Sequence, residues 1–191
     1  MKFVFGLLAF IITTIVLIVL IVSLFRGLNT ATTSTNPVKV SYNLLDGGAV
    51  DTAARMTLSG PIVAEEKYQS VRVTIDKTTR RVEVLTGYKG TVVKAQSYPN
   101  SKEAYEAFLN ALKAAQFTNV RDTSLNMRST CVTGNRYMFE LSASGSKKID
   151  TWTTSCATKA GSFAGDTSGT IGLFRAQIPN YGEVTNGLVV Y

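Results

Sequence analysis

Histidine is absent from this 191-residue sequence, which also has only two cysteines and one tryptophan. Without histidine the chain cannot form a Ser-His-Asp or Cys-His nucleophilic site, or the histidine-based metal sites of many hydrolases. Two thiols alone supply too few of the usual zinc ligands, so neither a metal nor a cofactor is expected. Phosphate-binding and dinucleotide-binding glycine patterns are also missing. These absences favour a protein that is not an enzyme.

Runs of basic residues are absent too. The chain has 20 Lys and Arg against 13 Asp and Glu, a formal charge of +7, but no basic run exceeds two residues. A nucleic-acid or heparin patch usually shows clusters of about five to eight basic residues. The composition therefore disfavours nucleic acid as a partner.

A long apolar run lies near the N-terminus. Residues 3–25 carry no charge, and about 20 helical residues cross a hydrocarbon core of roughly 30 Å. We therefore predict a transmembrane signal-anchor helix over residues 1–26. A cleaved signal peptide is the alternative, although its apolar region would be only about 7–15 residues long. The Thr- and Ser-rich residues 27–37 predict a polar linker, and residues 38–191 predict one domain.

The charges flanking the apolar run are nearly balanced, so the cysteines decide the expected orientation. Cys131 and Cys156 bracket an alternating stretch that is broken at residues 144–146, which predicts a hairpin with both cysteines at its open end. A disulfide there would indicate an oxidising compartment. We expect a single-pass protein of the cytoplasmic membrane with its C-terminal domain outside. Two unrelated buried thiols are the alternative.

Period-two hydrophobic patterns predict the strands of the domain. A strand-turn-strand pattern spans residues 71–84, and the second hairpin lies between the cysteines. Further strands are predicted at 38–44, 55–59, 91–98 and 188–190. Two segments have helical spacing: one begins at an Asn100 cap and fades near Gln116, and the other runs from an Asp166 cap to Pro179. The predicted class is α+β, an antiparallel sheet covered by one or two helices.

A shift of 66 residues superposes apolar positions of the two predicted hairpins and helices, which suggests two hairpin-helix units. The same shift brings basic residues to both hairpin turns. We predict that these turns contact an anionic envelope polymer or an acidic partner surface, or else carry ordinary charged turn residues. The residues concerned are Lys77, Arg80, Arg81, Lys147 and Lys148.

Three further patterns have weak catalytic or binding interpretations. Ser144 and Lys147 have the spacing of the Ser-x-x-Lys acylating motif, but they fall in a predicted β-turn and the companion motifs are missing. Glu65 and Glu66 are the only adjacent carboxylates, and sequence neighbours rarely face one substrate. Trp152, the single tryptophan, is expected in the core or against the disulfide, with an exposed ligand platform as the alternative.

The region from Cys131 through Trp152 and Cys156 to residues 177–179 resembles single-span envelope proteins of small-genome bacteria of the Saccharibacteria kind. The resemblance implies an anchored surface domain and transfers no functional residue. We therefore expect a membrane-anchored binding or scaffolding module of the cell envelope, with other envelope proteins or an anionic polymer as partners. The alternatives are an envelope enzyme using Ser, Lys or carboxylates, and a cytoplasm-facing subunit of a membrane complex.

Overall fold

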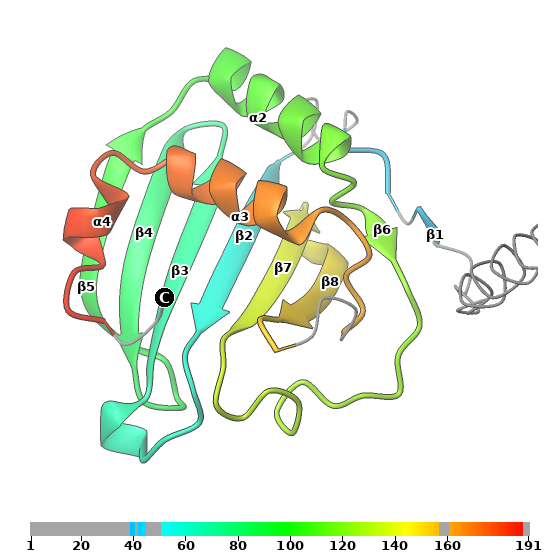
Figure 1. Cartoon of the computed structure of the whole chain (residues 1–191). Helices are drawn as coiled ribbons and strands as arrows, with labels where there is room; N and C mark the ends of the chain where they lie inside the picture. Colours follow the sequence, from blue (N-terminus) through cyan, green and yellow to red (C-terminus); the bar gives the residue numbers. More distant parts are fainter. Residues whose placement is uncertain (1–38, 41, 45–50, 157–160, 189–191) are drawn as a thin grey trace, which may run out of the picture. The chain divides into compact units, whose positions relative to one another are not determined.

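The computed structural model describes residues 39–40, 42–44, 51–156 and 161–188. Six strands form one antiparallel sheet in the order β5-β4-β3-β2-β7-β8 (Figure 1). A separate two-stranded ladder pairs β1 with β6. The strands are β1 (Lys39–Val40), β2 (Thr52–Ser59), β3 (Gln69–Asp76), β4 (Thr79–Thr86), β5 (Thr91–Pro99), β6 (Asn119–Val120), β7 (Arg136–Ala143) and β8 (Ser146–Thr154). The predicted antiparallel sheet is confirmed.

One face of this sheet carries the apolar core. Alternation along β2 turns Ala54, Met56 and Leu58 to that face, and they pair across the sheet with equally buried residues of β3 and β7. The helices α2 (Lys102–Ala114) and α3 (Thr167–Ala176) lie across the same face, and the short helix α4 (Tyr181–Val184) lies beside β5 (Figure 1). All the buried apolar side chains of this layer form one cluster.

Aromatic rings hold the helices to the strands. Phe139 of β7 lies 4.6 Å from the ring of Phe163 and 6.5 Å from that of Phe174 in α3, measured between centroids. Phe117, which follows α2, has its ring 6.0 Å from Phe139 and 6.1 Å from Phe174. Because these four rings come from four separate segments, they connect the two halves of the layer into a single core.

Helix starts agree with the sequence in one case and differ by one residue in the other. Asp166 caps α3 as predicted, accepting a hydrogen bond from the Gly169 N–H at 3.0 Å. The cap of α2 is Ser101, which accepts from the Ala104 N–H, and not the predicted Asn100. Asn100 instead donates to the Asp76 main-chain oxygen at the β3–β4 turn, a contact that the sequence pattern did not reveal.

Both hairpin turns have side chains suited to their backbone. At the β3–β4 turn, Asp76 Oδ1 accepts from the N–H groups of Thr78 and Thr79, each at 2.7 Å. At the β7–β8 turn, Ser144 and Gly145 have φ angles of 48° and 76°. Positive φ at both central residues is the pattern of a type I′ turn, whose twist matches that of the flanking strands. The two predicted hairpins are confirmed.

The ends of several elements differ from the sequence patterns. β2 begins at Thr52 and not at 55, and Ala54, at a fully buried position, extends the strand toward its start. Among the described residues of the predicted 38–44 strand, Lys39–Val40 form a strand and 42–44 do not, and Leu44 is buried. Leu188 is buried but lies outside any strand, and 189–190 lie outside the described residues.

The 66-residue shift places β3 on β7, β4 on β8 and most of α2 on α3. The strand order nevertheless excludes a two-fold repeat. β3 and β7 are both antiparallel to β2 and so run in the same direction. Their hairpin partners lie away from β2, with β4 on the outer side of β3 and β8 on the outer side of β7. A rotation that exchanged them would put α2 and α3 on opposite faces, whereas both cover the same face (Figure 1).

The predicted membrane anchor at 1–26 and the linker at 27–37 lie outside the described residues. Among the residues that are described, no helix has the length and apolar character needed to cross a membrane.

Candidate functional site

The second face of the sheet is polar, and in the described part of the chain none of the α-helices covers it (Figure 1). We call it the open face. It consists of the strand residues that alternate with the core residues, and its side chains are exposed or half-buried for the most part. Its charged strand residues are Arg55, Arg72, Arg81, Arg136 and Lys147 together with the carboxylates Glu83, Glu140 and Asp150.

Two buried glutamates organise these charges, and each is held between two cations. Glu140 lies 3.7 Å from Arg55 Nη1 and also pairs with Lys147, whose Nζ reaches Asp150 at 3.0 Å. Hydrogen bonds that Lys147 donates to Glu140 and then to Asp150 raise the pKa of Lys147 above its ordinary value. Lys147 is therefore a stably protonated ion-pair partner, and this protonation makes it a poor base for the nearby Ser144.

Glu83 is the second buried glutamate, and its cationic partners are Arg81 and Arg72. Its Oε1 accepts hydrogen bonds from Arg81, at 3.0 Å from Nε and 2.9 Å from Nη2. Arg72 Nη1 approaches Oε2 at 3.5 Å, a looser contact. The Nε atom of Arg72 is buried and has no hydrogen-bond partner among the described residues. Arg81 thus contacts Glu83 through two nitrogens and donates to Ser97 Oγ through Nη1 at 3.3 Å, while Arg72 retains donors for another acceptor.

A cavity of about 480 Å³ lies at one end of the open face, where β2 ends and β3 and β7 begin. We call it the basic cavity. The sheet contributes Ser59, Ser70, Arg72, Leu85, Arg136 and Met138, and three loops contribute Ile62, Tyr68, Gly87, Tyr88, Lys89, Gly90, Met127 and Arg128. Four of these residues are cationic and none is a carboxylate, so the cavity has a positive potential.

An aromatic pair forms one side of the basic cavity. Tyr68 and Tyr88 stack with ring centroids 4.1 Å apart. Tyr88 lies in the β4–β5 turn between Gly87 and Gly90, both with φ near +70°, and its hydroxyl donates to the Val63 main-chain oxygen at 2.6 Å. The ring of Tyr88 is still 51% exposed, so the aromatic surface stays accessible from solvent.

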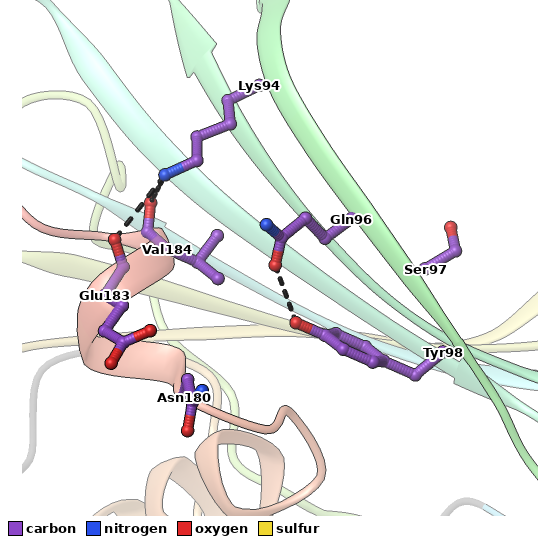
Figure 2. Close-up of a pocket in the computed structure, with 7 residues that line it drawn as sticks. All are labelled: Lys94, Gln96, Ser97, Tyr98, Asn180, Glu183 and Val184. Atoms are coloured by element: carbon purple, nitrogen blue, oxygen red, sulfur yellow. Dashed lines mark hydrogen bonds between the residues drawn. The ribbon is translucent and has the colours of Figure 1, made fainter.

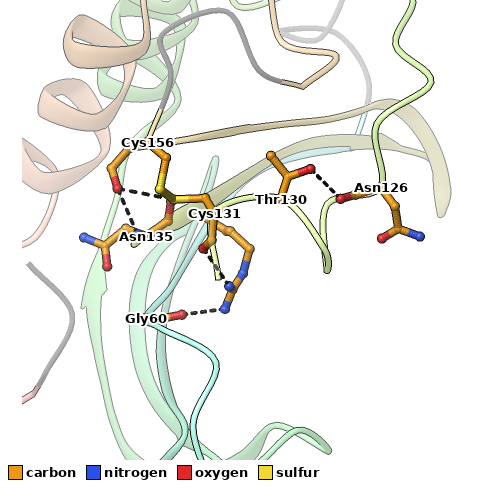
Figure 3. The surroundings of a disulfide bond; sticks show 8 residues. Gly60, Asn126, Thr130, Cys131, Asn135 and Cys156 are labelled. Carbon is orange, nitrogen blue, oxygen red and sulfur yellow. Dashed lines mark hydrogen bonds between the residues drawn. A yellow bond between two sulfur atoms is a disulfide. The ribbon is translucent and has the colours of Figure 1, made fainter. Parts of the chain in front are cut away.

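The disulfide supports the opposite side. Cys131 and Cys156 are bonded, with Cα atoms 5.5 Å apart, at the open end of the β7–β8 hairpin (Figure 3). This confirms the predicted pairing. Arg136 donates to the main-chain oxygens of Cys131 and Gly60, and the Ile62 N–H donates to the Val132 oxygen at 2.8 Å. The loop before the disulfide is thereby connected to β2 and β7 beside the cavity.

Asn126 shapes the part of that loop which enters the cavity. Its side-chain oxygen accepts from the Arg128 N–H at 2.8 Å. Its main-chain oxygen accepts from the Thr130 hydroxyl at 2.7 Å (Figure 3). These bonds close a tight turn over Met127 and Arg128, the two loop residues that line the cavity. The disulfide and the Asn126 turn together set the position of the Arg128 backbone.

The predicted basic turn residues are brought to one end of the sheet, but they are not equivalent there. Arg80 lies on the core face and donates to the oxygens of Pro99 and Gln177, so it has a structural role. Arg81 and Lys147 are engaged by carboxylates on the open face. Lys77 is half-buried and Lys148 is exposed. Contact of this group with an anionic partner stays a prediction, and the basic cavity lies at the opposite end of the sheet.

Trp152 lies on the open-face side of β8, opposite Met138, and is half-buried. Its main-chain N–H donates to the Ser162 hydroxyl at 3.2 Å, and its main-chain oxygen accepts from the Phe163 N–H at 3.0 Å. A Cβ at Gly161 would lie 2.1 Å from the Trp152 main-chain oxygen, so only glycine fits there. The segment around Ser162 thereby covers part of the β8 edge. A ligand-binding role for Trp152 stays a prediction.

A second cavity, of about 600 Å³, separates β5 from α4 (Figure 2). Lys94 donates to the Val184 oxygen at 3.0 Å, next to the C-terminal end of α4, and Tyr98 donates to Gln96 and to the Pro179 oxygen. These polar groups satisfy one another, and Lys94 neutralises the partial negative charge of the helix end. We interpret this cavity as the space between α4 and the edge strand β5, and these hydrogen bonds hold the two elements together.

Sequence reasoning missed the basic cavity. Arg72 and Arg136 were hidden among the polar positions of two strands, and Tyr68, Tyr88 and Arg128 occupy loops with no periodic pattern. The described residues contain no group of three or more Cys, Asp or Glu that could hold a metal ion. No protein family, curated protein or solved structure matches this chain. The resemblance to single-span envelope proteins therefore stays a prediction.

Proposed function

We propose that this protein is a membrane-anchored binding or scaffolding module of the bacterial cell envelope. A helix formed by residues 1–26 would hold it in the cytoplasmic membrane, and a polar linker at 27–37 would carry the domain on the outer side. The domain would bind its partner through the open face and the basic cavity.

The observation that carries this proposal is the Cys131–Cys156 disulfide beside the basic cavity. Disulfides persist in oxidising compartments, which supports an exterior domain. The 23 uncharged residues at positions 3–25 support the anchor. A sheet face that the α-helices leave uncovered, with a cationic and aromatic cavity at its end, supports a binding function.

The first experiment is cross-linking mass spectrometry on native membranes whose free thiols have been blocked beforehand. We expect an oxidised Cys131–Cys156 peptide pair together with cross-links to wall-associated, secretion, pilus or division proteins. A Cys131→Ser/Cys156→Ser variant, digested in parallel, identifies the oxidised peptide. Blocked, reduced thiols with cross-links to cytosolic proteins would overturn the exterior location.

Orientation is checked separately in intact cells with a membrane-impermeant amine reagent. Exposed lysines such as Lys67 and Lys148 should be labelled before lysis if the domain is outside. Labelling of these lysines only after lysis would contradict the proposed topology.

A further inference from the structure

The charge of the basic cavity restricts the class of ligand it can take. Arg72, Lys89, Arg128 and Arg136 line it, and no carboxylate does. Arg136 is 4% exposed and already donates to two main-chain oxygens, so its donors are largely used. Of the remaining three cations, Arg72 makes the loose 3.5 Å contact with Glu83, and neither Lys89 nor Arg128 forms a salt bridge with a described residue. An anionic group is the partner that fits this arrangement.

Arg72 is the cation best placed to contact that anion. Its guanidinium makes only a 3.5 Å contact with Glu83, and its buried Nε has no partner among the described residues. The Arg72 side chain is 32% exposed and makes one loose contact with Glu83, so its terminal nitrogens keep donors for a ligand oxygen. The planar guanidinium matches a carboxylate with two parallel hydrogen bonds.

Apart from the cations, Ser59, Ser70 and two glycines, the wall is apolar or aromatic. The Tyr68–Tyr88 stack, Leu85 and Met138 all line the same cavity, with Ile62 at its border. A small inorganic anion would leave this surface uncovered. The volume of about 480 Å³ lies in the range of small-molecule sites, which is roughly 300–1,000 Å³.

We propose that the basic cavity binds a carboxylate joined to an apolar or aromatic group, with the carboxylate on Arg72 and Arg128 and the apolar group against Tyr68 and Tyr88. Such a unit occurs at the C-terminus of a peptide ending in an apolar residue, and also in free aromatic acids. The proposal deepens the proposed binding function, because it names the chemical class that the site recognises.

The test uses the full chain, purified in detergent without reductant, and isothermal titration calorimetry. The probes are acetyl-Gly-Gly-Phe with a free carboxylate, the same peptide as its carboxamide, and 3-phenylpropanoate. We expect the free carboxylate to bind at least about tenfold more tightly than the carboxamide, the loss typical of removing a charge-assisted hydrogen bond. Binding of the peptide but not of 3-phenylpropanoate assigns a peptide C-terminus, whereas binding of both assigns the acid itself.

The matched variants are Arg72→Gln and Arg81→Gln. Both remove one cationic partner of Glu83, but only Arg72 lines the cavity. We expect Arg72→Gln to weaken binding about tenfold and Arg81→Gln to weaken it less, because the second variant keeps Arg72 in the cavity. Tyr68→Ala should also weaken binding, because it removes half of the aromatic stack. Thermal melts establish that each variant is folded.

Equal affinity for the carboxylate and the carboxamide, or equal effects of the two arginine variants, would overturn this proposal. Its failure is distinguishable from failure of the proposed function. If the probes do not bind but the membrane cross-links to envelope proteins persist, only the ligand class is wrong. If the probes bind but the thiols are reduced in cells, only the exterior location is wrong.

Discussion

Arg136 and Cys131 are linked across the end of strand β7, where Arg136 Nη1 donates to the main-chain oxygen of Cys131 at 3.3 Å. The sulfur of the same cysteine is bonded to Cys156 at the end of β8. One residue therefore joins a covalent bridge between two strands to a buried arginine that lines the basic cavity. This contact places the disulfide next to an arginine that lines the basic cavity.

The Cys131→Ser/Cys156→Ser variant should be less stable by about 3.5 kcal/mol, the chain-entropy estimate for closing a loop of this length. The residues are separated by 25 positions. Urea unfolding of the wild type and of the variant, under non-oxidising and oxidising conditions, measures the difference in their free energies of unfolding. Adding reductant should destabilise the wild type and leave the variant unchanged. Amide exchange in the loop around Asn126 should rise more than in the β7–β8 turn, and uniform exchange changes would contradict the local role of the disulfide.

Replacing Phe139 with Ala should destabilise the domain by about 3–5 kcal/mol, because a large side chain at the centre of the aromatic cluster leaves a cavity. Phe139 is fully buried and contacts rings from three other segments. Val93→Ala is the control, since Val93 is 59% exposed on the edge strand and should change stability by less than about 0.5 kcal/mol. Thermal and urea unfolding measure both. An equal loss of stability in Phe139→Ala and Val93→Ala would contradict the placement of Phe139 at the centre of the core.

Asp76 should make stability depend on acid pH. Partial burial acts to raise its pKa, but hydrogen bonds from Thr78 and Thr79 outweigh this and lower the pKa below 3.8. A lowered folded pKa contributes stability above the unfolded value that is lost as the pH falls through the folded pKa. Asp76→Asn should therefore be less stable than the wild type at pH 6, and the difference should shrink as the pH falls below about 3.8 and vanish below the folded pKa. Urea unfolding between pH 6 and pH 2 tests this, and a difference independent of pH would exclude the mechanism.

Glu140→Gln should lower the pKa of Lys147, because the hydrogen bond that Lys147 donates to the Glu140 carboxylate is the main cause of its raised pKa. Asp150→Asn should lower it less. A raised lysine pKa contributes stability below 10.5 that is lost as the pH rises through the folded pKa. An NMR titration of the Lys147 side chain between pH 8 and pH 12 measures the pKa in each variant. Asp150→Asn would lower the pKa of Lys147 more than Glu140→Gln if Asp150 were the dominant partner.

The elements that could be predicted are those whose causes are local. The β3–β4 hairpin follows from alternation on both sides of an Asp76 turn, and α3 follows from the Asp166 cap and the stop at Pro179. The disulfide could be predicted because the two cysteines lie at similar distances along the chain from the Ser144–Gly145 turn. The cap of α2 was misplaced by one residue because Asn100 and Ser101 are both good capping residues, and the contact that removes Asn100 is made with a distant turn.

The sequence alone determined the class of elements in this domain, the two hairpins and the disulfide, because turn chemistry, periodicity and cysteine spacing act over short stretches of chain. Only the tertiary structure decided that β2 lies between the two hairpins, that Glu83 is shared by Arg72 and Arg81, and that Tyr68 and Arg128 line one cavity. These relationships depend on strand order and register, which are fixed by packing of the whole core. A one-residue change of register would turn Arg72 to the opposite face, so no local pattern could have located the site.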